Sequence, residues 1–479
     1  MRLFGFSYKT VLAAGTALAV LFAALWLDLE NEGIAWNVLW NVTGEHEPAA
    51  QLLGASQYLA TYTRPAPRIA SNADIQHLPE NPFGVNTFLQ TEAEPQKREQ
   101  QMQMVAEAGF GWIRQEFPWE DIEIHGRGDF TDSRNDLDGD GKPDTISAWD
   151  KYDHIVNLAN QYEVEIIARL SAPPTWSQPP GTTNPYTPPA DFQDFANFAA
   201  AVAERYKGSI HYYQIWNEPN IYPEWGDQQI DPAGYTDLLC RTYQVLKEID
   251  PEIVVLSAAI GPTVDLSGRD AYDLLYLQRL YDFGAGECFD ILSAQGYGLF
   301  SGPTDRRMRP TVMNFGRHQW LRDIMVANGD AEKPIWISEA GWNPVPPLPD
   351  MWGYDTYGTV SMAEAADYVP IAYERALSEW PYVGVINYWF LKRHDDSERL
   401  QSWYYFRLLE PDFTPTPIYE SFKATIQGGE WRKWRDPRTS WEYQARERVP
   451  QVLILGLGIL FAAYVLARAL IERLLRAST

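Results

Sequence analysis

Tyr212-Tyr-Gln-Ile-Trp-Asn-Glu-Pro-Asn220 begins with aromatic and apolar residues and then turns polar at Asn217 and Glu218. A second stretch, Ile335-Trp-Ile-Ser-Glu-Ala-Gly-Trp342, follows the same plan and places Glu339 after an apolar run. Short apolar runs that would be buried on both faces are typical of strands in a parallel sheet. Where such strands close into a barrel, polar residues at their ends lie at the mouth, where βα loops begin.

Six further runs of this kind occupy the rest of the central region: Phe83–Leu89, Trp112–Phe117, Val164–Ser171, Ile253–Ala259, Ile291–Gln295 and Val383–Trp389. Helix-length amphipathic segments separate the runs, among them Gln96–Ala108, Ala190–Tyr206, Met362–Glu379 and the final Pro417–Ala424. Alternating strands and helices indicate a parallel sheet built from βα units. The sequence therefore predicts an α/β protein with a (β/α)8 TIM barrel over residues 81–427.

Glu218 and Glu339 would end the fourth and seventh strands and so point into the same mouth. Two carboxyl groups at one site suit glycosidic bond cleavage, in which one group donates a proton and the other stays ionised. Either glutamate alone could equally be a solvated loop residue or an ion-pair partner. The two together favour catalysis, and burial together with the negative charge of Glu339 would keep Glu218 protonated.

The runs Trp216-Asn-Glu-Pro219 and Ser338-Glu-Ala-Gly-Trp342 resemble glycoside hydrolases of clan A, particularly families 39 and 5. The resemblance covers about residues 83–424. It implies a retaining double displacement with Glu218 as general acid/base and Glu339 as nucleophile, their carboxyl groups ~5–5.5 Å apart. It also implies that the chemistry needs no cofactor.

Further site residues follow from the same resemblance. Arg114, at the end of the second strand, matches an arginine that keeps the nucleophile ionised. Asn217 matches a residue that binds the sugar 2-hydroxyl, and Tyr297 matches a tyrosine that donates a hydrogen bond to the nucleophile. Gln295 is a departure, because many members have His two residues before that tyrosine. Glutamine can hydrogen-bond there but cannot titrate.

Aromatic residues in the predicted mouth loops are candidates for stacking on sugar faces. Trp389 matches the aromatic floor of the subsite that binds the cleaved sugar, and we also place Trp342 among the substrate-binding residues. Trp176, Trp225 and Trp352 fall in the same loops. For any one of these residues, packing within a loop is as good an explanation as sugar binding.

The 479 residues carry a formal net charge of −25, which argues against a nucleic-acid partner because phosphate binding needs clustered Lys and Arg. Acidic polysaccharides are disfavoured for the same reason. Cys240 and Cys288 permit one disulfide but do not predict it, and they exclude a disulfide framework or a cysteine-based zinc site.

Both ends of the chain contain uncharged apolar runs, Val11–Leu27 and Val452–Ala467, each about as long as a membrane span requires. We therefore predict a transmembrane anchor at 1–28 and a transmembrane helix with a basic tail at 451–479. The distribution of flanking charges would place both termini in the cytoplasm and the barrel outside, at the cell membrane. A cleaved signal peptide is the alternative for the first run.

The segments between these runs and the barrel carry weaker signals. Residues 29–80 contain scattered Pro and Asn and are interpreted as a stalk. Their aromatic run, Trp36-Asn-Val-Leu-Trp40, suits the interfacial layer of a membrane beside the anchor. Residues 428–450 are rich in Trp, Arg and Tyr, which suits a juxtamembrane segment.

An insertion at 129–147 contains Asp136-Leu-Asp-Gly-Asp-Gly-Lys-Pro-Asp144, which is spaced like the first nine positions of an EF-hand-like loop. The candidate ligand positions for a structural calcium are Asp136, Asp138, Asp140, Lys142 and Asp144. The loop lacks the glutamate expected at its twelfth position, so a solvated acidic turn is the alternative.

These features predict a membrane-anchored retaining glycosidase that cleaves a β-linked oligo- or polysaccharide outside the cytoplasm. Its partners would be the carbohydrate substrate and, through the two spans, membrane lipid. The competing hypothesis is a non-catalytic glycan-binding or structural ectodomain of a membrane assembly, because fold alone does not guarantee activity.

Overall fold

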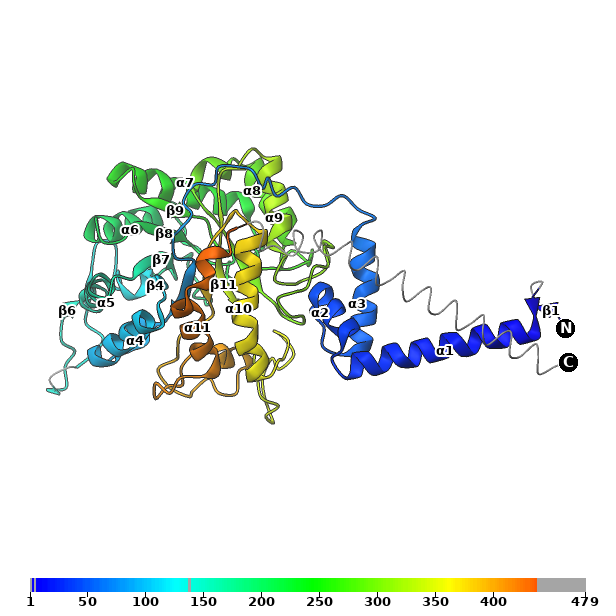
Figure 1. Ribbon diagram of the computed structural model, residues 1–479. Helices are drawn as coiled ribbons and strands as arrows, with labels where there is room; N and C mark the ends of the chain where they lie inside the picture. Colours follow the sequence, from blue (N-terminus) through cyan, green and yellow to red (C-terminus); the bar gives the residue numbers. More distant parts are fainter. Residues whose placement is uncertain (1, 4–5, 137–138, 437–479) are drawn as a thin grey trace.

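The computed structural model describes residues 2–3, 6–136 and 139–436, and its centre is a ring of parallel strands (Figure 1). The strands of the ring are β3 (Phe83–Thr87), β4 (Trp112–Pro118), β7 (Glu165–Ser171), β8 (Tyr212–Ile215), β9 (Val254–Leu256), β10 (Leu292–Tyr297), β11 (Ile335–Gly341) and β12 (Val383–Tyr388). Their order is β10-β11-β12-β3-β4-β7-β8-β9. Parallel bridges from Leu256 to Ile291 and from Ile260 to Ala294 join the two ends. The predicted eight-stranded (β/α)8 arrangement is confirmed.

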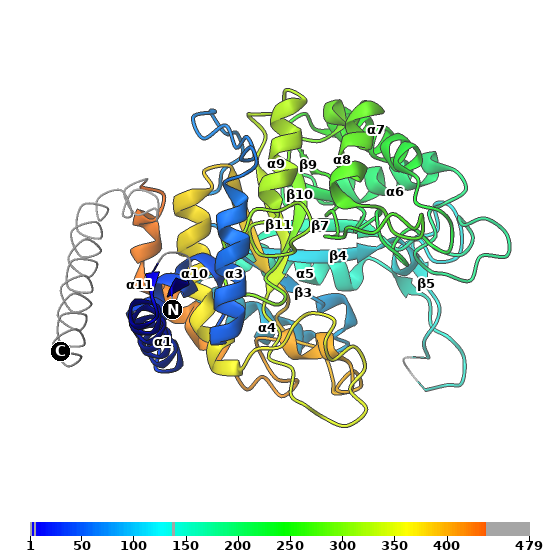
Figure 2. The same cartoon turned by 90° about the vertical axis from the view of Figure 1, so that its right-hand side faces the viewer.

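Helices cover the outside of the ring, as Figure 2 shows from the side. They are α4 (Pro95–Ala108), α5 (Asp150–Gln161), α6 (Phe192–Arg205), α7 (Pro232–Ile249), α8 (Asp273–Asp282), α9 (His318–Ala327), α10 (Met362–Glu379) and α11 (Pro417–Gly428). Short 3-10 helices are η1 (Leu89–Thr91), η2 (Trp119–Asp121), η3 (Ala285–Cys288), η4 (Ser402–Phe406) and η5 (Glu430–Lys433). The serine Ser361 begins α10 with a capping box to Glu364, which satisfies two otherwise free N–H groups.

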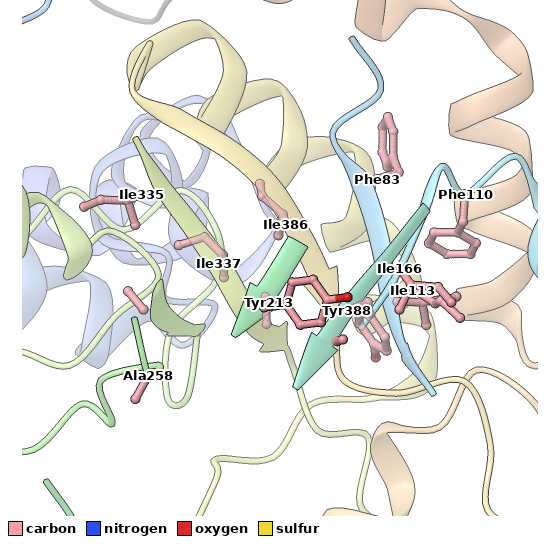
Figure 3. Packing of buried hydrophobic residues seen from close by; sticks show 14 of the residues in the cluster. Phe83, Phe110, Ile113, Ile166, Tyr213, Ala258, Ile335, Ile337, Ile386 and Tyr388 are labelled. Carbon is pink, nitrogen blue, oxygen red and sulfur yellow. The ribbon is translucent and has the colours of Figure 1, made fainter. Parts of the chain in front are cut away.

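The strands are buried on both faces, so the core extends both inside the ring and between the ring and its helices (Figure 3). At the ends where the strands begin, Trp112, Tyr212 and Trp336 pack together with ring centroids 4.9–5.2 Å apart. These aromatic side chains fill that end of the barrel. Polar side chains occupy the opposite end, where the strands finish, so the two ends of the barrel have different chemistry.

The disulfide between Cys240 and Cys288 joins α7 to η3, with Cα atoms 4.9 Å apart. The two residues are 48 positions apart in the sequence, so the bond ties together elements on either side of β9. The sequence left this pairing open.

The N-terminal region forms α1 (Tyr8–Glu30), α2 (Ile34–Thr43) and α3 (Pro48–Thr61), with two short strands, β1 (Arg2–Leu3) and β2 (Phe6–Ser7), before them. Figure 1 shows α1 leading away from the barrel, whereas α2 and α3 lie beside α10. Residues 29–80, which we expected to be a stalk, therefore contain two helices that pack on the barrel. Asp28 fixes the turn between α1 and α2 by accepting hydrogen bonds from the backbone N–H groups of Ile34 and Ala35.

The α2–α3 pair contacts the loop that follows β10. Thr304 donates a hydrogen bond of 2.6 Å to the carbonyl of Trp40, and Arg307 forms an ion pair of 2.7 Å with Glu45. Trp40 also stacks on Tyr368 of α10, with ring centroids 5.6 Å apart. These contacts bury the tryptophan that sequence reasoning assigned to a membrane interface.

The predicted membrane topology is wrong. In the described part of the chain, no helix combines the length and the apolar character that crossing a bilayer requires. The predicted C-terminal span at 451–479 lies outside the described residues, as does the part of the juxtamembrane segment after Asp436.

Candidate active site

Glu218 and Glu339 lie at the same end of the barrel but on different elements. Glu339 is within β11, and Glu218 follows β8, where Asn217 forms an isolated bridge with Ala259 beyond the end of β9. The backbone N–H of Glu218 donates to the carbonyl of Ala259 at 2.9 Å. Trp216 and Glu218 both have positive φ, at 75° and 39°, a conformation that side-chain-bearing residues adopt rarely. Such backbone strain persists where the surrounding structure holds it and is concentrated at functional sites.

The carboxylate of Glu339 is held by one hydrogen bond on each oxygen. Arg114 donates to its Oε1 at 2.9 Å, and the hydroxyl of Tyr297 donates to its Oε2 at 2.6 Å. Glu339 is 5% exposed. A buried carboxylate is stable only when it is paired and hydrogen-bonded, and both conditions are met here.

Arg114 organises the site through its whole guanidinium group. Besides Glu339, it donates to Gln214 at 2.6 Å, to Asn86 at 2.9 Å and to Asn217 at 2.8 Å. Burial lowers the pKa of Arg114 to about 10, and the charge of Glu339 acts in the opposite direction. The group therefore remains a cation at neutral pH and supplies the positive charge that Glu339 needs.

Glu218 has the opposite environment. Burial raises its pKa well above the ordinary value, and the negative charges of Glu339 and Glu224 raise it further. The side chain of Gln295 donates a hydrogen bond of 3.0 Å to its Oε1, which acts to lower the pKa but does not offset burial. Burial therefore favours the protonated form of Glu218, and its hydrogen-bond partner Gln295 is the residue that stands where many clan A members have His.

Glu224 is a third carboxyl group at the site, in the loop that follows β8. Burial, together with the charges of Glu339 and Glu116, raises its pKa to about 7, while Arg169 and a hydrogen bond from Asn217 lower it. Asn217 thus contacts both Glu224 and Arg114. The Trp216 indole N–H donates a hydrogen bond of 2.7 Å to the backbone carbonyl of Glu224, which helps to fix this loop.

A charged pair lies beside these residues, at the ends of β4 and β7. Glu116 and Arg169 are register partners on the two strands, and their side chains form an ion pair of 2.5 Å. Both line a small cavity together with Arg114 and Trp389. Glu116 is one of three consecutive polar residues within β4, and Arg169 is followed by Leu170 in β7. Neither ends an apolar run, and sequence reasoning did not select them.

The aromatic candidates have different outcomes. Trp389 lines the cavity and is half-buried, and the peptide bond that joins it to Phe390 is cis. Trp342 is not brought to the carboxyl groups: it is 5% exposed, and its indole N–H donates to the carbonyl of Ser301 at 2.7 Å. Tyr357, which sequence reasoning missed, packs on Tyr297 with ring centroids 6.1 Å apart.

The remaining tryptophans of the mouth loops also differ. Trp225 is buried against Trp216 and Tyr235, so it packs within its loop. Trp176 donates from its indole N–H to the carbonyl of Glu123 at 2.8 Å. Trp352 is exposed and contacts Trp403 edge to face.

The predicted calcium loop lies in the insertion between β5 (Thr131–Asp132) and β6 (Ile146–Ser147). Leu137 and Asp138 are outside the described residues. Both oxygens of Asp136 accept backbone N–H groups, from Gly139 at 2.7 Å and Gly141 at 2.8 Å. Among the side chains that the structure describes, no group of His, Cys, Asp or Glu is arranged to hold a metal ion. The calcium site stays a prediction from spacing.

Neither a family model nor a curated protein matches the chain. Among solved structures, a family 39 glycoside hydrolase from the gut symbiont Bacteroides cellulosilyticus superposes with a TM-score of 0.51 at 20% identity, over 76% of this chain and 66% of that enzyme. A family 5 glycoside hydrolase from Streptomyces cattleya, in complex with GlcNAc, superposes with a TM-score of 0.51 at 16% identity, over 75% of this chain and 81% of that one. At these identities, the likeness establishes the barrel fold.

Proposed function

We propose that this chain is a retaining glycoside hydrolase that cleaves a β-linked oligo- or polysaccharide. One observation carries the proposal: the two carboxyl groups at the mouth have different surroundings. Arg114 and Tyr297 stabilise the ionised form of Glu339, whereas burial and neighbouring negative charge keep Glu218 protonated. Double displacement needs one carboxyl group that can donate a proton and a second that is positioned to attack the anomeric carbon.

In the first step, Glu218 donates its proton to the glycosidic oxygen as the bond from that oxygen to the anomeric carbon breaks. The Glu339 carboxylate attacks the anomeric carbon and forms a glycosyl ester. In the second step, the ionised Glu218 accepts a proton from water, the water oxygen bonds to the anomeric carbon, and Glu339 leaves as a carboxylate. Arg114 and Tyr297 hold Glu339 in one orientation throughout.

The substrate class and compartment are supported by separate observations. The neighbours from Streptomyces cattleya hold GlcNAc and, in a variant form, Manβ1-4GlcNAc, which favours a β-linked saccharide for this barrel. The disulfide between Cys240 and Cys288 favours an oxidising compartment, because thiols in the cytosol are kept reduced. We therefore propose an extracytoplasmic saccharide as the substrate.

The test is mass spectrometry of the protein after incubation with 2-deoxy-2-fluoro β-glycosides that carry good leaving groups. We expect wild type to gain the mass of one glycosyl group on the peptide that contains Glu339, and Glu339→Gln to gain none. Glu218→Gln is the matched control, because an activated leaving group needs no acid and its adduct should still form.

Azide provides the second arm of the test. With Glu218→Ala, added azide should attack the glycosyl ester and release a β-glycosyl azide, which proves net retention. Labelling of Glu339→Gln, or an α-linked product from Glu218→Ala, would contradict the assignment of roles. No adduct and no turnover with any sugar of a broad panel would instead favour a non-catalytic glycan-binding domain.

A further inference from the structure

The ion pair between Glu116 and Arg169 is placed and oriented in a way that a purely structural pair would not require. Glu116 Oε1 also accepts a hydrogen bond of 2.8 Å from the hydroxyl of Ser171, and Oε2 accepts one of 3.4 Å from Gln90. The side chains of Glu116 and Arg169 are only 15% and 14% exposed. Removing two charges from water is costly, and apolar residues of similar volume often stabilise a protein as well or better.

Both side chains line the small cavity described above. The same cavity is also lined by Trp389 and Arg114. A guanidinium has five N–H donors, more than one carboxylate can accept, and a carboxylate has about four acceptor positions. The pair therefore has donors and acceptors left over beside an aromatic ring, the combination that binds a sugar ring by its face and its hydroxyl groups.

The position of the cavity in the ring identifies which part of a substrate it would bind. Its lining residues come from β12, β3, β4 and β7, whereas Glu218 follows β8. The general acid must contact the oxygen of the leaving group, so the leaving group extends on the side of Glu218. The cavity is lined by Arg114, which is bound to Glu339, so we place in it the sugar that becomes attached to Glu339.

The charged side chains around the cavity also restrict which sugars can bind there. Arg169 lies in the field of Glu116, Glu224 and Glu339, and Arg114 is already bound to Glu339. A ligand carboxylate brought into this cavity would meet guanidinium groups that are already neutralised and carboxylates that repel it. An uncharged ring with free hydroxyl groups meets no such repulsion.

We infer that Glu116 and Arg169 are specificity-determining residues that bind hydroxyl groups of an uncharged sugar and exclude uronic acids from the glycone side of the site. This inference rests on the proposed function for the orientation of the substrate. In the bound state, Glu116 accepts a hydrogen bond from one hydroxyl, Arg169 donates to a neighbouring hydroxyl oxygen, and Trp389 packs on the ring face.

The test combines variants with sugars that differ by one group. Substrates are 4-nitrophenyl β-glycosides of xylose, glucose and glucuronic acid, with the single deoxy analogues of the sugar that wild type prefers. We expect kcat/KM for the glucuronide to be at least a hundredfold below that for the glucoside. Glu116→Gln should lower kcat/KM for the preferred sugar roughly tenfold to a hundredfold, as expected for a hydrogen bond to a charged group.

The deoxy analogues separate specificity from general damage. For the analogue that lacks the hydroxyl bound by Glu116, wild type and Glu116→Gln should have equal kcat/KM, whereas the other analogues should keep the difference. Arg169→Lys, which keeps the charge but loses the planar fork, should act on a different hydroxyl. The exposed Glu204→Gln on α6 is the control and should change none of these ratios.

Calorimetric binding of free xylose, glucose and glucuronate to the wild-type protein gives a readout that needs no turnover. Binding of a neutral sugar that Glu116→Gln weakens at least tenfold, without hydrolysis of any glycoside, would retain the inference and overturn the proposed function. Hydrolysis with equal rates on glucuronide and glucoside, or equal losses on every deoxy analogue, would overturn the inference and retain the proposed function. Neither binding nor turnover would overturn both.

Discussion

Replacing Glu224 by Gln is expected to stabilise the fold at alkaline pH and to have little effect in acid. The pKa of Glu224 is raised from 4.5 to about 7 in the folded protein, mainly by burial. Each pKa unit corresponds to about 1.4 kcal/mol, so holding the ionised group in the fold costs about 3 kcal/mol. Glutamine has nearly the same shape and can keep the contact with Asn217 without carrying the charge.

The pH dependence of this effect follows from the raised pKa of Glu224 in the folded protein. Below pH 4 the glutamate is protonated in both the folded and the unfolded chain, so it causes no loss of stability. Between about 4.5 and 7 the unfolded chain ionises first, and the free energy of unfolding falls as pH rises. Above pH 7 the whole cost is present, so the advantage of Glu224→Gln should reach about 3 kcal/mol at pH 8.

Thermal unfolding at pH 4, 6 and 8 measures this difference, with the exposed Glu252→Gln as the control for loss of one negative charge. The same shift in Tm for Glu224→Gln at pH 4 and pH 8 would contradict this explanation. An equal rise in Tm for Glu252→Gln at pH 8 would contradict it as well. Activity gives a second readout. Because the charge of Glu224 raises the pKa of Glu218, the alkaline limb of the kcat/KM profile should move to lower pH in Glu224→Gln.

Three further variants test the rest of the site and the fold. Tyr297→Phe removes the hydrogen bond to Glu339 and should lower kcat roughly tenfold to a hundredfold in steady-state assays; an unchanged kcat would exclude this role for the hydroxyl. Arg114→Met leaves Glu339 buried without its cation and should lower the free energy of unfolding by about 3–5 kcal/mol at pH 7, and an equal Tm to wild type would contradict that cost. The double variant Cys240→Ser/Cys288→Ser should have a free energy of unfolding lower by about 2–4 kcal/mol. Wild type in reductant should match this double variant in thermal unfolding.

The barrel could be predicted from sequence because its strands are buried on both faces. Each strand is then an uninterrupted apolar run, and the amphipathic helices between the runs complete the pattern. The helix α10 was predicted with its observed bounds, Met362–Glu379. Its capping box gives a helix start that local sequence alone determines.

The candidate site was predicted best where its residues lie on strands or directly after them. Glu339, Arg114 and Tyr297 lie on strands, and the structure brings them into hydrogen-bond contact. Glu224 lies in a loop, where no periodicity indicates which side chains turn inward. Trp342 shows the opposite limit, because a tryptophan that follows a strand can equally be buried by the next loop.

The N-terminal region shows how the same composition fits two environments. Trp36 and Trp40 near an apolar run suit a membrane interface, but in the structure they stack on each other with ring centroids 5.8 Å apart and pack near His46. An aromatic side chain with one polar edge is suited to any boundary between apolar and wet surroundings. Sequence reasoning could not identify that boundary as α10 and the loop after β10, because these are more than 250 residues away in the chain.

The α2–α3 pair changes where the smallest self-sufficient unit of this protein begins. A chain truncated so that it begins at residue 81 would keep every strand of the ring. It would, however, leave Arg307 without Glu45 and uncover the surface that Trp40 covers. The loop so exposed begins just after Tyr297, whose hydroxyl contacts Glu339. Expression, crystallisation and engineering of the barrel should therefore start before Ile34, because the first eighty residues contain part of the wall that supports the site.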